Sequence, residues 1–418
     1  MLAVWLRREH NRVETAGTRA NTGRRVLPCL KERDAVVDDS IDLSQLDGVI
    51  RPPDQADSLP PWCYTSQAFL DLEIAQVFRS AWTSLGRADR VAAPGDYAAI
   101  ELAGVPIVLL RDKAGALRAY ANSCRHRGTK LLQGTGHCRV IKCPFHGWTY
   151  GLDGRLTWTP AMQRAEGFEK DDYGLLPVRL AERDGFAFVN LDGTAPPLDD
   201  WLGEFSDRHA PWSFADMVTA RRREFEVACN WKLFLEVFNE YYHLRFVHPN
   251  SIGGIYDGPD EPEAVEGQFI TQFGTHEGTG GLLEDDRDKA FPAIEGLEGR
   301  NLGGTRYTLV FPNLTFAASV DAMWIYDVTP RAPNRTCVGM TCAFPRATAA
   351  LPDFAARAEA YLRRLDVAIA EDIEVLELQQ AGLDSPLARP GRFSHLEPNV
   401  AAFGSWIAER CAKAAGAG

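Results

Sequence analysis

Two pairs of cysteine and histidine residues constrain this chain more than any other feature. Cys124 and His126 form the first pair, Cys143 and His146 form the second, and sixteen residues separate the pairs. Thiolates are soft anionic ligands and neutral imidazoles are borderline ligands, so these side chains suit zinc or an iron–sulfur cluster. Each pair supplies one ligand of each kind, which allows each pair to reach both irons of a two-iron cluster. The stretch therefore predicts a metal site.

Zinc and a chance grouping of buried residues are the alternatives to an iron–sulfur cluster. Zinc fingers usually pair like ligands, whereas unlike ligands are paired here. The flanking residues Gly128, Gly134, Gly136, Gly147 and Pro144 suit two tight loops that present ligands from hairpin tips. The pattern favours a [2Fe–2S] cluster with two cysteines on one iron and two histidines on the other, which is the Rieske form.

Composition narrows the class of protein. A length of 418 residues predicts two domains, and 45% apolar with 24% charged residues is an ordinary globular balance. The net charge of −12 makes nucleic acid an unfavourable partner. No apolar run approaches the ~18 residues of a membrane span, and the apolar run after Met1 is too short for a secretory signal. We therefore expect a cytoplasmic protein without membrane contact.

The order of hydrophobic patterns predicts an α+β fold in two domains after an extension. Residues 1–57 are polar and then rich in proline, which suits an N-terminal extension. Residues 58–192 begin with a helix, capped by Thr65 or Ser66, and continue as short alternating strands, which predicts a small all-β domain around the cluster.

Residues 193–418 predict a second domain of helices packed on an antiparallel sheet, in the manner of a helix-grip fold. Apolar residues recur at helical spacing from Trp231 to Tyr242, and residues 251–303 predict a long loop over a site. Strands are expected over 305–345, a long helix over 351–383 and a short terminal helix after it.

A second metal site is indicated on the first helix of this domain. Glu240, His243 and His248 include two histidines and a carboxylate, the ingredients of a facial triad for non-haem Fe(II). A spacing of five residues turns His248 roughly 140° from His243 on a regular helix, so we expect the helix to bend or widen near Phe246, as it would at a π-bulge. Two ordinary core or surface histidines are the alternative, and the spacing by itself does not exclude them.

The two segments together resemble one family. The sequences CRHRG and CPFHGWTY are similar to the Rieske domain of the Rieske non-haem iron oxygenases, and NWKLFLEVFNEYYHLRFVHP resembles the catalytic iron segment of their alpha subunits. The resemblance implies a [2Fe–2S] cluster, shielded by Trp148, whose ligands are Cys124, His126, Cys143 and His146. It also implies a mononuclear Fe(II) whose ligands are His243, His248 and Asp372. Glu371 is the rival to Asp372 as the third ligand.

In this family the position of Glu240 holds a carboxylate that bridges His243 and a cluster histidine of a neighbouring subunit, which is His146 by position. Most ring-hydroxylating members have Asp there. Glutamate resembles the branch that acts on choline, carnitine, glycine betaine and stachydrine. Members of that branch often have Glu-Asn where this chain has Glu236 and Val237.

The resemblance implies the terminal component of a monooxygenase or dioxygenase, in a homotrimer. A reductase, with or without a ferredoxin, delivers electrons from NAD(P)H, and the protein uses O2 on a small organic substrate. We expect N-demethylation or C–N cleavage of a quaternary or tertiary amine. Hydroxylation or O-demethylation of an aromatic acid is the alternative, and an arginine or lysine in the pocket is expected for it. A Rieske electron-transfer protein without a catalytic iron is the third hypothesis.

Aromatic side chains near the second site are candidates to bind an ammonium group, because ring faces attract cations. The same residues on strands commonly pack into a core, which is the alternative for each of them. Asp321 or Asp327 is the expected acid beside the ammonium. The candidate pocket residues are Phe238, Tyr241, Tyr307, Phe311, Phe316, Trp324 and Tyr326.

Overall fold

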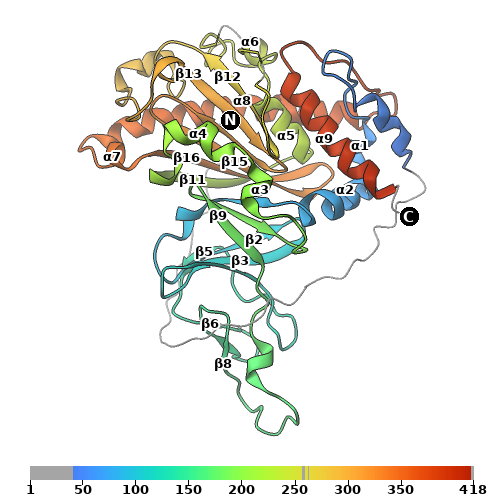
Figure 1. Cartoon of the computed structure of the whole chain (residues 1–418), viewed down its shortest axis with the longest axis vertical. Coiled ribbons are helices and arrows are strands. Elements are labelled where there is room, and N and C mark those ends of the chain that lie inside the picture. Colours follow the sequence, from blue (N-terminus) through green and yellow to red (C-terminus); the bar gives the residue numbers. More distant parts are fainter. Residues whose placement is uncertain (1–40, 257–258, 262, 416–418) are drawn as a thin grey trace. The chain divides into compact units, whose positions relative to one another are not determined.

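A computed structural model describes residues 41–256, 259–261 and 263–415, and the predicted extension lies outside them as far as residue 40 (Figure 1). Residues 90–178 form one compact unit, and the described residues before and after them form a second, larger unit. The expected α+β class is confirmed. The domain boundaries at 57/58 and 192/193 stay predictions, but in packing residues 58–89 and 179–192 belong with the larger unit.

The smaller unit is built from two antiparallel sheets. The first has the order β4-β3-β2-β5 and the second the order β6-β7-β8. Ala103 and Gly104, both with positive φ, make the tight turn between β2 and β3. A core that includes Val108, Ile141 and Trp148 lies between the sheets. The bounds are β2 Asp96–Leu102, β3 Val105–Arg111, β4 Leu117–Ala121, β5 Thr135–His137, β6 Ile141–Lys142, β7 Thr149–Tyr150 and β8 Leu156–Trp158.

The larger unit is organised around a six-stranded antiparallel sheet with the order β11-β16-β15-β14-β13-β12. The expectation of a long loop over 251–303 is wrong for β12, whose residues Phe269, Thr271 and Phe273 alternate as a strand requires. The bounds are β11 Met217–Val227, β12 Phe269–Thr275, β13 Gly304–Val310, β14 Leu314–Ala318, β15 Met323–Ala332 and β16 Arg335–Pro345.

One face of this sheet packs against a three-stranded sheet of order β1-β10-β9 and against two short helices. Phe186 of β10 stacks on Phe316 of β14 with ring centroids 5.8 Å apart, and Phe205 and Phe214 surround them. The bounds are β1 Thr83–Arg87, β9 Arg179–Arg183, β10 Phe186–Asn190, α3 Leu198–Leu202 and α4 Phe205–His209. This face is the main apolar core of the larger unit.

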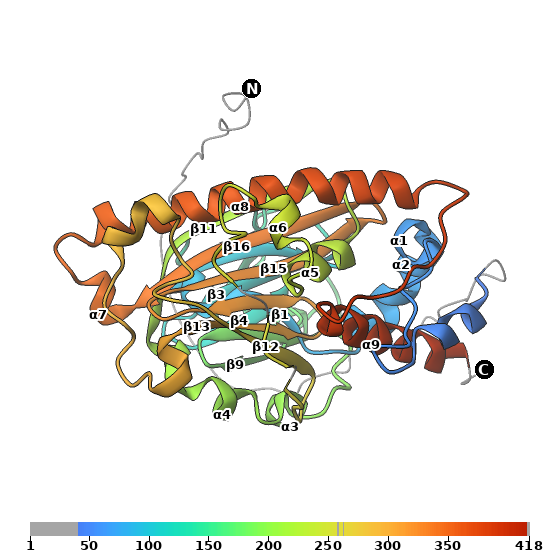
Figure 2. The same cartoon turned by 90° about the horizontal axis from the view of Figure 1, so that it is seen from above.

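Helices cover the other face of the sheet. Figure 2 shows α8 extending along the sheet beside β11, and α5 and α9 contact β15 and β12 respectively. Ser66 caps α2 as expected, since its side chain accepts from the amide of Phe69. The bounds are α1 Trp62–Thr65, α2 Gln67–Glu73, a π-helical turn Ile74–Arg79, α5 Trp231–Phe238, α6 Leu244–Val247, α7 Arg346–Ala349, α8 Phe354–Leu383 and α9 Pro398–Ala415.

Short 3-10 turns connect several of these elements. They span Leu43–Gly48, Ala88–Val91, Lys170–Tyr173, Ala210–Trp212, Phe214–Asp216, Glu284–Lys289 and Gly299–Leu302. None of the helices in the described part of the chain combines the length and the apolar character that a membrane span needs.

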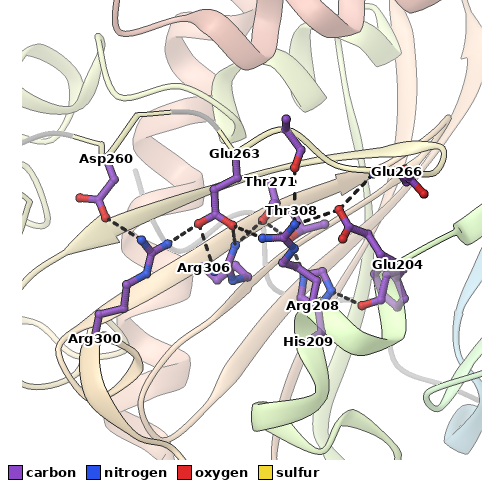
Figure 3. Close-up of polar contacts among 12 residues, drawn as sticks. Glu204, Arg208, His209, Asp260, Glu263, Glu266, Thr271, Arg300, Arg306 and Thr308 are labelled. Atoms are coloured by element: carbon purple, nitrogen blue, oxygen red, sulfur yellow. Dashed lines mark hydrogen bonds and ion pairs between the residues drawn. The ribbon is translucent and has the colours of Figure 1, made fainter.

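A network of ion pairs ties the segment before β12 to the sheet (Figure 3). Glu263 accepts from Arg208 of α4 and from Arg306 of β13, each at 3.0 Å, and it also pairs with Arg300. Arg208 reaches Glu204 at 2.9 Å as well. Because Arg306 is buried, its charge needs this carboxylate. The network therefore anchors part of the stretch that the sequence suggested to be a loop.

A buried ion pair fixes the start of α5. Lys232 and Glu73 are fully buried, and Nζ of Lys232 lies 2.7 Å from the Glu73 carboxylate. The ammonium also donates to the carbonyl of Cys63 and to the side chain of Asn230, and Trp231 donates to the second oxygen of Glu73. Burial raises the pKa of Glu73, although Lys232 opposes the shift. The charges are thus satisfied only in this arrangement of α5 against α1 and α2.

We expect Lys232→Met to lower the free energy of unfolding by about 3–5 kcal/mol, because it leaves Glu73 buried without its counter-charge. Urea denaturation followed by tryptophan fluorescence measures the change. The double variant Lys232→Met/Glu73→Gln removes both charges and should recover most of the loss. Equal stability of the single and double variants would contradict this account of α5.

Candidate metal centres and substrate pocket

Two loops of matching geometry carry the cysteine–histidine pairs. In each loop the amide of the glycine four residues after the cysteine donates to the cysteine carbonyl, at 2.9 Å for Gly128 and 3.1 Å for Gly147. The amides of Cys124 and Cys143 donate to the carbonyl five residues onward, at 2.9 and 2.8 Å. Both glycines have positive φ, 76° and 73°, which a side chain would strain. The two predicted ligand loops are therefore equivalent in backbone conformation.

The four side chains converge at the ends of these loops. The thiols of Cys124 and Cys143 are buried, whereas His146 is exposed. The rings of His126 and His146 lie 4.7 Å apart, and His126 stacks on Trp148 at 4.9 Å. Two buried thiols and two outer imidazoles match the donor set of a Rieske cluster, and Trp148 lies beside it as a shield.

The protonation of these groups also fits a metal cluster. Burial lowers the pKa of His126, and the neighbouring charges of His146 and Arg127 act in the same direction. A neutral imidazole is the form that binds metal. Burial raises the pKa of the Cys124 thiol, so the positive charge of a metal is needed to form the thiolate. The hydroxyl of Tyr150 lies 3.2 Å from the sulfur and offsets part of that shift.

The second predicted centre is also brought together. One ligand atom from each of His243, His248 and Asp372 lies within 4.8 Å of the other two. Oδ1 of Asp372 lies 2.9 Å from Nε2 of His248 and 3.6 Å from Nε2 of His243. This oxygen is buried and accepts no aligned hydrogen bond from any residue that the structure describes. A metal ion between the three side chains would satisfy it, and two imidazoles with one carboxylate suit non-haem Fe(II).

The backbone reaches this geometry by breaking the helix, so the expected departure from a regular helix is confirmed, but it is a break between Phe238 and Leu244 and not a π-bulge near Phe246. Helix α5 ends at Phe238, and α6 begins at Leu244 after an irregular turn. His243 precedes α6 and His248 follows it. The break has a local cause, because the Glu240 carboxylate accepts from the amides of Tyr242 and His243 and replaces helical hydrogen bonds there.

Two further carboxylates orient the histidines. Glu240 Oε1 lies 2.5 Å from Nδ1 of His243, and Glu371 Oε2 lies 2.7 Å from Nδ1 of His248. Ser251 donates to the same oxygen of Glu371 at 2.6 Å. Each ring therefore donates Nδ1–H to a carboxylate and turns Nε2 toward Asp372, as metal-binding histidines commonly do. The geometry favours Asp372 over Glu371 as the third ligand.

The charge on His248 depends on the same two acids. Burial opposes protonation of its ring, but Asp372 and Glu371 outweigh burial and raise the pKa. A proton on Nε2 occupies the position that a metal would take. Protons and metal therefore compete for this site.

A pocket of about 440 Å³, which includes its open mouth, is lined in part by His243, His248 and Asp372. Five of the seven aromatic candidates line it, from α5, from the turn after it, and from β13 and β15. They are Phe238, Tyr241, Tyr307, Trp324 and Tyr326.

Phe316 does not line the pocket, because sheet register places it on the opposite face. Phe316 of β14 is paired with Thr308 of β13 on one side and with Ile325 of β15 on the other, so these three side chains lie on the same face of the sheet. Tyr307 and Trp324 are one residue displaced in this register, so they face the helices. Phe316 lies in the main core instead.

The expected acids are also absent from the pocket wall. Asp321 accepts hydrogen bonds from Thr279 and Tyr361, and Asp327 pairs with Arg222. The wall carries Arg364 instead, a residue that the sequence analysis missed. Its spacing of eight residues from Asp372 was the available signal, because residues i and i+8 belong to the same broad face of a helix.

Known proteins share both parts of this structure. Residues 81–171 match the Rieske [2Fe–2S] domain, and residues 214–413 match the catalytic domain of the ring hydroxylating alpha subunit. The glycine betaine monooxygenase oxygenase subunit of Chromohalobacter salexigens is 28% identical over 388 residues, covering 84% of this chain and 85% of that protein. The carnitine monooxygenase oxygenase subunit of Acinetobacter pittii is 36% identical over 200 residues, covering 47% and 54%.

A solved structure extends the comparison. It is a quaternary ammonium Rieske monooxygenase, described as revealing insights into carnitine oxidation and inter-subunit electron transfer. It is 26% identical, has a TM-score of 0.75, and the match covers 87% of this chain and 98% of that one.

We expect Glu371→Gln to weaken Fe(II) binding at the second centre by about 10- to 100-fold, because His248 loses the carboxylate that orients it. Titration of the iron-depleted site with Fe(II) under anaerobic conditions measures the affinity. Glu374→Gln is the matched control, since Glu374 is exposed on the same helix. An unchanged affinity in Glu371→Gln would show that the contact with His248 does not support metal binding.

Proposed function

Because the chain belongs to the Rieske non-haem iron oxygenases, we propose that it is the oxygenase component that demethylates, or cleaves a C–N bond of, a quaternary or tertiary amine. As a member of this family it uses a Rieske [2Fe–2S] cluster and a mononuclear iron. The observation that carries the substrate proposal is an aromatic wall directly beside the His243, His248 and Asp372 group.

The relatives support an amine substrate. Two of them are named for glycine betaine and carnitine, which both carry a trimethylammonium group. Aromatic ring faces attract such cations, which cannot donate hydrogen bonds. Phe238, Tyr307 and Tyr326 line the pocket, and the ring centroid of Phe238 lies 5.5 Å from that of Tyr307 and 4.7 Å from that of Tyr326. This wall suits an ammonium group held near the metal site.

Each group at the catalytic site then has a defined role in the proposal. His243, His248 and Asp372 hold the iron, which, when bound, supplies the oxidation of a C–H bond with O2. Glu240 and Glu371 keep both imidazoles in the tautomer that leaves Nε2 free. The aromatic wall excludes water and directs an N-methyl group toward the ligands. A hydroxylated N-methyl carbon is a hemiaminal, which separates into an amine and formaldehyde.

Electrons reach this site from a reductase, as in other oxygenase components of the family, and a ferredoxin as intermediary remains a prediction. We propose Cys124, His126, Cys143 and His146 as the cluster ligands, and a homotrimer in which Glu240 joins His243 to His146 of a neighbouring copy. His146 is exposed, and Phe145 and Trp158 in its unit are 58% and 52% exposed.

Large apolar side chains are also exposed around Glu240, where Tyr242 is 52% and Phe246 80% exposed. Two apolar surfaces, one beside each end of the proposed electron route, suit a head-to-tail contact that closes into a ring. The cytoplasmic location stays a prediction.

Arg364 favours a second candidate function. A cation in the pocket is the feature expected for an aromatic acid, which the enzyme would hydroxylate or O-demethylate. This candidate shares the metal centres and differs only in the substrate. A Rieske electron carrier without a catalytic iron is disfavoured by the buried, unsatisfied oxygen of Asp372 between two histidines.

We expect the purified protein, assayed with a reductase, NADH and O2, to release formaldehyde from N-methylated amines and to contain about three irons and about two sulfides per chain. His243→Ala should retain about two irons and the cluster EPR signal while losing turnover. Turnover by His243→Ala at the wild-type rate would refute the catalytic site. Oxidation of aromatic acids alone would replace the amine by the second candidate.

We expect Glu240→Gln to keep both metal centres but to slow the transfer of electrons between them by at least about 100-fold, because an amide cannot accept from two imidazoles as a carboxylate does. Rapid mixing of the reduced, substrate-bound protein with O2, followed by cluster absorbance, measures the rate. Glu374→Gln serves as the exposed control. Cluster oxidation at the wild-type rate in Glu240→Gln would exclude the bridge.

A further inference from the structure

We infer that Arg364 binds a carboxylate of the substrate, so that the amine oxidised at this site is a zwitterion with an N-methyl group at one end and a carboxylate at the other. The inference rests on the proposed amine oxidation. It adds a specificity-determining residue that neither the cysteine–histidine motifs nor the metal ligands indicate.

The guanidinium of Arg364 is a buried charge, and no carboxylate among the residues that the structure describes pairs with it. The residue is 2% exposed and lines the pocket. Its Nε and Nη2 atoms are buried, and neither donates to an acceptor within the described ranges. Burial of an unpaired charge is unfavourable, so a ligand that supplies the missing anion is strongly favoured.

The acids on the neighbouring turns already have other partners. Asp366, two residues along α8, pairs with Arg221 and Arg223. Asp321 is bound by Tyr361 and Thr279. Asp372 belongs to the proposed iron site. None of these described acids is therefore free to pair with Arg364, and a bound ligand can supply the anion.

The two unpaired donors have the geometry that a carboxylate requires. Nε–H and Nη2–H lie on the same edge of the guanidinium plane, and a carboxylate accepts from two such parallel donors. The face of the plane is already used, because Cζ lies 4.6 Å from the ring centroid of Trp324. The indole Nε1 of Trp324 is likewise buried without an acceptor among the described atoms. The stacked pair thus leaves an edge of donors for an anion.

The position of Arg364 defines the two ends of the substrate. Arg364 and Asp372 lie eight residues apart on α8, which corresponds to roughly 12 Å along the helix axis. Both residues line one pocket, with the rings of Tyr307 and Tyr326 also in its wall. A carboxylate on Arg364 therefore leaves the ammonium group to the aromatic wall and an N-methyl group to the metal site.

Binding to the anaerobic, oxidised protein tests the inference without turnover. The probes are γ-butyrobetaine and its carboxamide, in which an uncharged amide replaces the carboxylate and the trimethylammonium group is kept. The two molecules differ only at the group that Arg364 is inferred to bind. Calorimetry should show wild-type protein binding the carboxylate about 10- to 100-fold more tightly than the carboxamide. Arg364→Gln should lose this preference.

Two variants control the comparison. Arg363→Gln alters an outward-facing arginine on the same helix that pairs with Asp286, and it should keep the wild-type preference. Arg364→Lys keeps the charge but loses the paired donors, so its preference should fall between those of wild type and Arg364→Gln. Iron content and the cluster EPR signal establish that each variant is folded. If Arg364→Gln does not fold, the wild-type and Arg364→Lys preferences decide the question.

The failure of this inference is distinguishable from the failure of the proposed function. Equal affinity of wild type for the carboxylate and the carboxamide, with formaldehyde released from both, would refute the role of Arg364 and leave amine oxidation standing. An unchanged preference in Arg364→Gln would refute it as well. Tight binding of benzoate but not of either amine, lost in Arg364→Gln, would confirm the anion site and refute the amine.

Discussion

The buried contact between Lys232 and Glu73 determines where α5 begins, and the catalytic site depends on where that helix begins and ends. The ammonium, the Asn230 cap and the Trp231 indole hold the first turn against α1 and α2. The helix is eight residues long and ends at Phe238, and the turn that follows it carries Glu240 and His243. A buried ion pair gives little net stability by itself, but it penalises any other register strongly. Such a constraint suits a site in which three ligand atoms must converge.

The two carboxylates behind the histidines have the same chemical task in different surroundings. Glu371 is satisfied within the chain, since it accepts from both His248 and Ser251. Glu240 accepts from His243 and from backbone amides, and large exposed apolar side chains flank it. One carboxylate therefore has both of its partners within the chain, and the other is the one that we propose to bridge to a neighbouring copy.

Local patterns in the sequence predicted the parts of the site that depend on local structure. The ligand loops with Gly128 and Gly147, the Ser66 cap and the long helix around Asp372 were all readable because each follows from spacing within a few residues. The break after α5 was not, because a side chain replaces the helical hydrogen bonds. Phe316 was wrongly predicted to line the pocket, because the face of the sheet on which a side chain lies depends on strand register, which pairs residues distant in the sequence. Arg364 was missed because an unpaired charge is recognised only when its surroundings are known.

Helix α8 runs for 30 residues without a break, and this continuity has a consequence for how the enzyme could diversify. Arg364 and Asp372 lie on the same uninterrupted helix, so the movement of a loop does not change the distance between them. A related enzyme that binds a longer or shorter substrate would need its arginine on another turn of this helix, such as position 361 or 368. Each such step changes the reach by roughly 5 Å, the length of several carbon–carbon bonds. The substrate range of this scaffold would then change in discrete increments rather than gradually.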